Sequence, residues 1–229
     1  MRLEGHVAVV TGGTGALGRA VTSAFLAAGA RVVATTRHAV DGESHERLSI
    51  EAADLTDEQS MLALADMVRE RYGRCDVLAC CGGGFESGLP VAEAPLALWQ
   101  RLLDLNATSC FLASRAFLPL MVEARRGSVV FVGSKAALHP FPGGVPYSVS
   151  KATVIALTKA LAVELRDQGV TVNCVLPSVI DTPATRAASP DADVSRWVTP
   201  EELAETILWI SSSGARETSG AVIPVYGRA

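Results

Sequence analysis

The chain has 229 residues, 49% of them hydrophobic and 19% charged, so it is long enough to bury one large core. Its formal net charge of −4, from twenty Lys and Arg against twenty-four Asp and Glu, argues against nucleic-acid binding, which needs a basic face or arm. No apolar stretch reaches the ~20 residues of a bilayer span, no signal peptide opens the chain, and five cysteines favour reduced thiols, so we expect a cytoplasmic protein without membrane partners.

Short β-branched segments alternate along the chain with longer segments of helical periodicity. The strands are predicted at 6–11, 31–35, 48–53, 76–81, 128–133, 170–176 and 221–225, with 48–53 the weakest. The helices are predicted at 17–28, 57–72, 96–125, 147–168 and 200–212, with Asp57 and Thr199 at helix starts. The most irregular, polar segments are 37–47 and 183–196. This alternation predicts a doubly wound α/β fold: one parallel sheet of about seven strands with helices on both faces.

The glycine-rich segment T-G-G-T-G-A-L-G, residues 11–18, directly follows the first strand and opens the first helix. In that setting backbone N–H groups at the helix start face a pyrophosphate, and glycines let the backbone approach it closely. A plain strand–helix loop is the alternative, and the βα context disfavours it. The segment therefore predicts a dinucleotide site. The pair Cys80-Cys81 lacks the C-x-x-C spacing and nearby histidines of a metal site, so no metal is expected.

A second motif, Y-S-V-S-K at 147–151, lies near the start of a predicted helix, and its Tyr147 and Lys151 project from one helical face. Ser134 lies thirteen residues upstream, just past the fifth strand. With residues 11–18, Asp54-Leu55, Asn106 and Pro177…Thr182, this order of motifs resembles the short-chain dehydrogenase/reductase family over nearly the whole chain. The resemblance implies one Rossmann domain over 1–229, with a dinucleotide-binding part at 1–133 and a catalytic and substrate part at 134–229.

The resemblance also implies the site. Tyr147 donates a proton to the carbonyl oxygen as hydride arrives, Lys151 lowers the pKa of that phenol, and Ser134 holds the oxygen. Asn106 helps bind a water that links Lys151 to solvent. The implied cofactor-binding residues are Gly12, Thr14, Gly15, Ala16, Leu17, Gly18, Thr36, Arg37, Asp54, Leu55, Gly82, Tyr147, Lys151, Pro177, Val179, Ile180 and Thr182.

The end of the second strand bears on the choice of cofactor. An acid there accepts a hydrogen bond from the free 2′-OH of NAD, but this chain has Thr36-Arg37 and no acid until Asp41. A guanidinium suits the 2′-phosphate of NADP, so NADP(H) is favoured over NAD(H). The alternative is that Arg37 is a solvated loop residue.

The chain departs from the family pattern at Ala16, where a glycine is usual, at Cys80-Cys81 and at Ser178. Seventeen residues separate Thr36 from Asp54, and sixteen separate Thr182 from Thr199; both segments are short for the family. These trimmed segments, with C-C-G-G-G at 80–84, are also similar to dihydropteridine reductase, a relative in the same superfamily.

We expect a ketone reductase or alcohol dehydrogenase acting on a small organic substrate. The alternatives are a dihydropteridine-reductase-like enzyme and a non-catalytic dinucleotide-binding sensor. The helices at 96–125 and 147–168 are expected to form a homodimer or homotetramer. The expected substrate pocket comprises Leu138, Phe141, Val145, Ser178 and Trp197.

Overall fold

Seven parallel strands form one sheet in a computed structural model that describes residues 1–37 and 46–228. The strand order is β3-β2-β1-β4-β5-β6-β7. Successive strands are therefore added on one side of β1 as far as β3 and on its other side from β4 onward, so the strand order reverses between β1 and β4. This confirms the predicted doubly wound α/β fold. The strands are β1 Val7–Thr11, β2 Arg31–Thr36, β3 Leu48–Ala52, β4 Val77–Cys80, β5 Gly127–Val132, β6 Val170–Pro177 and β7 Val222–Val225.

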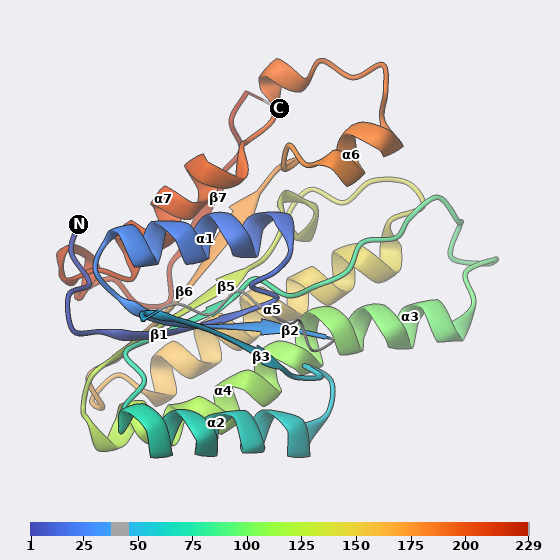
Figure 1. Ribbon diagram of the computed structural model, residues 1–229. Coiled ribbons are helices and arrows are strands. Elements are labelled where there is room, and N and C mark those ends of the chain that lie inside the picture. The colour runs from blue at the N-terminus through green and yellow to red at the C-terminus, as the bar shows by residue number, and fades with distance from the viewer. Residues whose placement is uncertain (38–45, 229) are drawn as a thin grey trace.

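Helices cover both faces of the sheet (Figure 1). On one face α1 (Ala16–Ala27) packs beside α7 (Pro200–Ile210), and their apolar side chains share a core with β1, β2 and β6. On the other face lie α2 (Glu58–Tyr72), α4 (Ser109–Glu123) and α5 (Val145–Glu164). The strands β1 and β4 are buried along their whole length, which explains why their sequences are almost entirely apolar rather than alternating.

Side-chain caps fix two of the predicted helix starts. The Asp57 carboxylate accepts a hydrogen bond from the backbone N–H of Ser60 and so begins α2. Thr199 and Glu202 form a capping box at α7, in which each side chain accepts from the other residue's backbone N–H. Both predicted starts are confirmed.

Three predicted segments differ from the structure. The single helix predicted at 96–125 is divided into α3 (Leu96–Leu103), a π-helical turn at Asp104–Thr108, and α4. The helix predicted at 147–168 runs from Val145 to Glu164, because Pro146 is tolerated in a first helical turn. The segment predicted to be irregular at 183–196 contains α6 (Pro183–Ala188), which a Thr182–Thr185 capping box begins. Of the segment 37–47, residues 38–45 lie outside the described residues.

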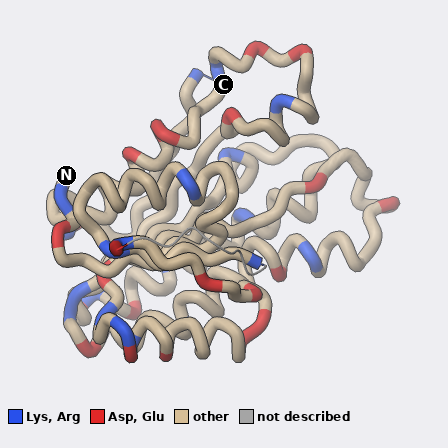
Figure 2. Tube along the Cα trace, viewed as in Figure 1, with Lys and Arg blue, Asp and Glu red and all other residues tan. Residues whose placement is uncertain are grey.

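The stretch Leu96–Glu123 is, by length and composition alone, apolar enough to cross a membrane, although no stretch of that length was predicted from the sequence. Its most apolar window is 61% buried inside the fold, and its α4 part contributes Phe117 and Met121 to the core, which explains its apolarity. Charged residues of both signs are interspersed over the outer helices and loops (Figure 2).

Candidate active site

The glycine turn lies between the carboxyl end of β1 and the start of α1, at the point where the strand order reverses. Gly15 is the N-cap of α1 and provides no side-chain cap, so the first N–H groups of this 12-residue helix have no side-chain partner. The backbone N–H of Gly12 donates to Thr35 Oγ1 at 3.0 Å, which ties the turn to β2. An uncapped helix start at this edge of the sheet fits an anionic group such as a pyrophosphate.

Three glycines in this turn, Gly12, Gly13 and Gly18, leave no room for a side chain; a Cβ on Gly13 would lie 2.6 Å from Ala34 Cβ. A Cβ on Gly18 would lie 2.1 Å from the Gly12 carbonyl oxygen, and one on Gly12, whose φ is +64°, would lie 2.7 Å from Gly82 Cα. Gly15 differs, because its φ is −72° and its nearest neighbour would be 3.3 Å away. Ala16 is exposed at the first position of α1, so the departure from the family glycine falls where the fold has space.

The neighbouring edge of the sheet carries Thr36, which ends β2, and the exposed Arg37. Asp54 follows β3, and hydrogen bonds from the Thr56 hydroxyl and backbone N–H lower the pKa of its carboxyl, helped by the nearby Arg37 guanidinium. Leu55 packs onto the glycines after β4, since a Cβ on Gly82 would lie 2.4 Å from Leu55 Cδ1. The predicted residues from β1, β2, β3 and β4 therefore share one edge of the sheet.

Asn106 and Lys151 meet beneath the end of β4. The Asn106 side chain, 1% exposed, accepts from the Gly84 N–H at 2.9 Å and donates to the Gly84 carbonyl and to Ser150 Oγ, each at 3.0 Å. A Cβ on Gly83 would lie 2.7 Å from Asn106 Oδ1 and 3.4 Å from Lys151 Nζ. The π-helical turn therefore places the side-chain amide of Asn106 beside Gly83, where the Lys151 ammonium also lies.

Lys151 is buried in α5, and its Nζ donates to the Val132 carbonyl at the end of β5, at 2.9 Å. One turn earlier in α5, Tyr147 is half-buried, and its backbone carbonyl accepts from Ser150 Oγ at 2.7 Å. Ser134 lies two residues after β5 and is 6% exposed; its Oγ accepts from the Ala136 N–H at 3.1 Å. Because α5 packs on the turn that Ser134 begins, the three polar groups lie around one end of β5.

Thiols line the interior below this group. Cys80 and Cys110 are buried and hydrogen-bonded to each other, and Cys174 lies close by in β6. Burial raises the pKa of the Cys174 thiol to about 12, although the Lys151 ammonium acts in the opposite direction. Among residues 1–37 and 46–228, no group of three or more His, Cys, Asp or Glu side chains is placed to hold a metal ion.

Sequence reasoning missed Phe85, which follows the three glycines after β4. Its ring centroid lies 4.8 Å from that of Tyr147, with the ring planes at 84°, and 6.5 Å from that of Phe141. Phe85 is 63% exposed. No motif marks this residue, because the contact joins side chains 62 positions apart; the only local signal was a large aromatic after a glycine run.

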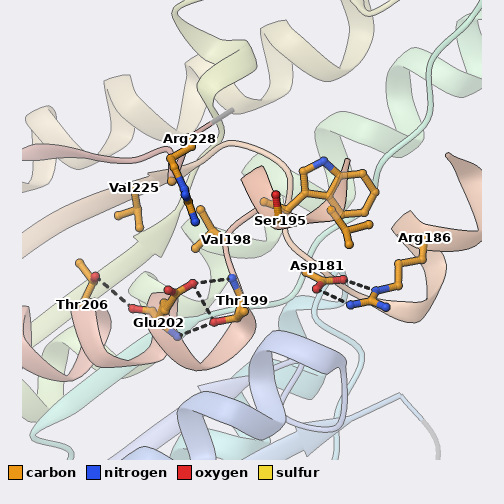
Figure 3. A pocket seen from close by; sticks show the side chains of 12 residues that line it. Asp181, Arg186, Ser195, Val198, Thr199, Glu202, Thr206, Val225 and Arg228 are labelled. Atoms are coloured by element: carbon orange, nitrogen blue, oxygen red, sulfur yellow. Dashed lines mark hydrogen bonds and ion pairs between the residues drawn. The ribbon is translucent and has the colours of Figure 1, made fainter. Parts of the chain in front are cut away.

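The predicted pocket residues fall into two places. Leu138, Phe141 and Val145 are exposed apolar residues on the segment that leads into α5. Trp197 instead lines a separate cavity of about 540 Å³, together with Asp181, Arg186 and Arg228, none of which belongs to the Ser134–Tyr147–Lys151 group (Figure 3). In this cavity Arg186 forms two hydrogen bonds to Asp181 and holds the pKa of its carboxyl low.

The segment after β6 carries the remaining predicted residues. Pro177 ends β6, Val179 is 38% exposed, and Ile180 forms a parallel bridge with Val198. The Ser178 hydroxyl donates to the Tyr226 carbonyl at 2.7 Å, so this departure from the family pattern is engaged with the C-terminal segment. Thr182 caps α6.

Comparison with known proteins gives consistent matches. The family model described as short chain dehydrogenase matches residues 6–193. The chain is 35% identical to galactitol 2-dehydrogenase of Rhizobium johnstonii, covering 98% of this chain and 95% of the relative. It is 32% identical to 3-oxoacyl-[acyl-carrier-protein] reductase FabG of Thermotoga maritima, covering 99% and 98%.

Solved structures agree with these matches. A short-chain type dehydrogenase/reductase from Mycobacterium ulcerans superposes with a TM-score of 0.92 at 26% identity, covering all of this chain and 90% of that one. Both nicotinamide cofactors occur among the similar proteins. One is a 2-dehydro-3-deoxy-L-rhamnonate dehydrogenase (NAD(+)) of Sphingomonas sp., and another, ElxO, has been solved with NADP bound.

Proposed function

Since the chain belongs to the short-chain dehydrogenase/reductase family and is therefore an oxidoreductase acting on CH–OH groups, we propose that it is an NADP(H)-dependent ketone reductase or alcohol dehydrogenase. The observation that carries this proposal is the grouping of Ser134, Tyr147 and Lys151 around the end of β5, beside an uncapped helix start that fits a dinucleotide. The bound nicotinamide supplies or accepts the hydride; the chain's own side chains handle the proton.

Tyr147 is the proposed proton donor during reduction and acceptor during oxidation. An unperturbed tyrosine has a pKa of about 10, so its phenol gives up a proton to a developing alkoxide but needs help to exist as phenolate. The ammonium of Lys151, one helical turn away, supplies that help by stabilising the negative charge. The hydrogen bond from Lys151 to the Val132 carbonyl orients the ammonium.

Ser134 is the proposed anchor for the substrate oxygen. Its Oγ already accepts from the Ala136 N–H, which leaves its own hydrogen available for donation to a carbonyl oxygen. Asn106 is proposed as a positioning residue, because its amide fixes Gly84 and Ser150 around the lysine. We propose that it also helps to place a water through which Lys151 exchanges protons with solvent.

The preference for NADP(H) rests on Arg37. An exposed guanidinium directly after β2 suits a 2′-phosphate, and the strand end offers Thr36 where a carboxylate would repel that phosphate. The other proposed cofactor-binding residues are those of the glycine turn, Asp54-Leu55, Gly82 and the segment from Pro177 to Thr182.

Two further assignments belong to the proposal. Phe111 in α4 and Val163 in α5 are exposed, which supports assembly of a homodimer or homotetramer through the segments 96–125 and 147–168. Five free cysteines support a reducing, cytoplasmic compartment.

Incubation of the purified protein with NADPH or NADH and a panel of carbonyl compounds, followed by the absorbance of the reduced nicotinamide, tests the function. We expect carbonyl-dependent oxidation that is faster with NADPH. If the protein binds NADPH but no carbonyl compound of the panel causes its oxidation, the protein would instead be a dinucleotide sensor. Rapid turnover of quinonoid dihydropterin alone would favour the dihydropteridine-reductase-like alternative.

A further inference from the structure

Phe85 has no role in the hydride and proton chemistry, yet it lies against the residue proposed to carry it. Its ring meets the Tyr147 ring edge to face at 4.8 Å, and 63% of the residue remains open to solvent. Phe141, 37% exposed, lies 6.5 Å from Phe85 with the ring planes tilted by 36°. Two large exposed aromatic side chains thus lie next to each other, and one of them contacts the ring of Tyr147. Exposed apolar surface of this kind beside a reacting residue marks a binding surface.

The backbone holds these rings in place. The N–H of Gly88 donates to the Gly143 carbonyl at 3.0 Å, which joins the loop that carries Phe85 to the loop that carries Phe141. Gly143 has a φ of +73°, and a Cβ there would lie 3.0 Å from the Gly88 backbone. A Cβ on Gly144 would lie 2.7 Å from the Phe141 ring. The two loops are therefore in contact, and the rings form a supported wall.

The spacing of the rings limits what they can hold. Carbon atoms in contact lie about 3.5–4.0 Å apart, so a flat ring placed between two others needs about 7 Å between their centroids. At 6.5 Å and 36°, Phe85 and Phe141 cannot hold a substrate between them. They present a single apolar surface, which a substrate covers from one side.

The charged neighbours of this wall are engaged elsewhere. Glu86 is paired with Arg101. Lys135 lies over the Tyr226 ring at 5.2 Å, and the His139 ring contacts the same tyrosine. Leu138 and Val145, which are exposed on the segment that leads into α5, are apolar. An apolar ring gains from this surface, whereas a chain of hydroxyl groups finds few partners on it.

We infer that Phe85 and Phe141 select substrates whose carbonyl belongs to an apolar ring, such as a cyclic ketone or the matching cyclic secondary alcohol. The ring lies on the Phe85–Phe141 wall and directs its oxygen toward Tyr147. This inference rests on the proposed function, since it takes Tyr147 as the reacting group.

Three probes and four variants test it. Cyclohexanone and 2-hexanone have six carbons each and differ in the ring, and the ketose xylulose represents polyols. We expect wild-type kcat/KM to be highest for cyclohexanone. Phe85→Ala and Phe141→Ala each remove roughly 60 Å² of apolar contact, so KM for cyclohexanone should rise on the order of tenfold with little change in kcat. Phe85→Tyr should retain the low KM.

Val91→Ala is the control, because Val91 is an exposed apolar residue further along the same loop. It should leave all three substrates unchanged. Equal losses in Phe85→Ala for cyclohexanone and 2-hexanone, or a wild type that prefers xylulose, would overturn the inference while leaving the proposed function intact.

A binding measurement separates the two proposals completely. Tyr147→Phe keeps the ring that contacts Phe85, so its complex with NADPH should bind cyclohexanone in calorimetry, and adding Phe85→Ala should weaken that binding. Phe85-dependent binding without any turnover by the wild type would count against the proposed function alone. Binding that ignores Phe85 would count against the inference.

Discussion

The floor of the active site and the wall above it differ in how their residues are held. The floor consists of Gly12, Gly18, Asn106, Lys151 and the half-buried Tyr147. Backbone contacts and buried hydrogen bonds fix the first four, with no space for a side chain at either glycine. The wall, Phe85 and Phe141, consists of exposed side chains on loops. We propose that the floor provides the hydride and proton chemistry and that the wall determines which substrate is bound.

The largest effect should follow from the floor's reacting group. Tyr147→Phe removes the proton donor but keeps the ring, so turnover should fall by about 10²–10⁴ while NADPH affinity stays near the wild-type value. Steady-state kinetics and cofactor titration check both parts. If the variant turned over any carbonyl at the wild-type rate, the floor would not carry the chemistry.

Ser134 separates ketone reduction from pterin reduction. If the protein reduces ketones, Ser134→Ala loses the hydrogen bond to the substrate oxygen, which strengthens in the transition state. We then expect kcat to fall on the order of 10²-fold. A quinonoid pterin offers no single alkoxide for a serine to hold, so its reduction should hardly change. Efficient dihydropterin reduction by both the wild type and Ser134→Ala would reverse our choice between the two.

Arg37 tests whether an exposed residue can determine the choice of cofactor. It directly follows β2, at the same edge of the sheet as the glycine turn. Charge-assisted hydrogen bonds contribute about 1.5–3 kcal/mol, so Arg37→Ala should weaken NADPH binding roughly ten- to a hundredfold and NADH binding much less. Calorimetry with both cofactors measures the difference. Equal losses for the two, or tighter NADH binding by the wild type, would refute the NADP(H) preference.

The glycine turn tests how rigid the floor is. Gly18→Ala places a Cβ 2.1 Å from the Gly12 carbonyl, and overpacking of this kind costs about 1–3 kcal/mol, or roughly 2–4 °C in Tm for each kcal/mol in a chain of this size. Gly15→Ala is the matched control, because its Cβ would lie 3.3 Å from the Gly12 carbonyl oxygen and the residue has an ordinary φ of −72°. If the Tm of both variants equalled that of the wild type, the glycine turn would be able to shift and accommodate the added Cβ, and the floor would not be rigid there.

These contrasts explain what the sequence could predict. Tyr147 and Lys151 could be placed on one helical face because they are only four residues apart. Asp57 and Thr199 could be predicted as helix starts because their side chains accept hydrogen bonds from backbone N–H groups of the first turn. The π-helical turn at Asp104–Thr108 has no such local signal, because its residues also suit a regular helix. The contact of Phe85 with Tyr147 depends on how two distant loops meet, which no short-range pattern encodes.

Direct observation of hydride transfer tests the central claim, that the floor moves a hydride and a proton to a carbonyl through Tyr147. The wild type is mixed with cyclohexanone and NADPH carrying deuterium at both C4 positions, and the product is analysed by mass spectrometry. We predict cyclohexanol with one deuterium on the carbinol carbon, and almost none from Tyr147→Phe in the same time. Three results would contradict the account: unlabelled cyclohexanol, no labelled alcohol from the wild type with cyclohexanone or any other carbonyl compound of the panel, or equal amounts of labelled product from both proteins.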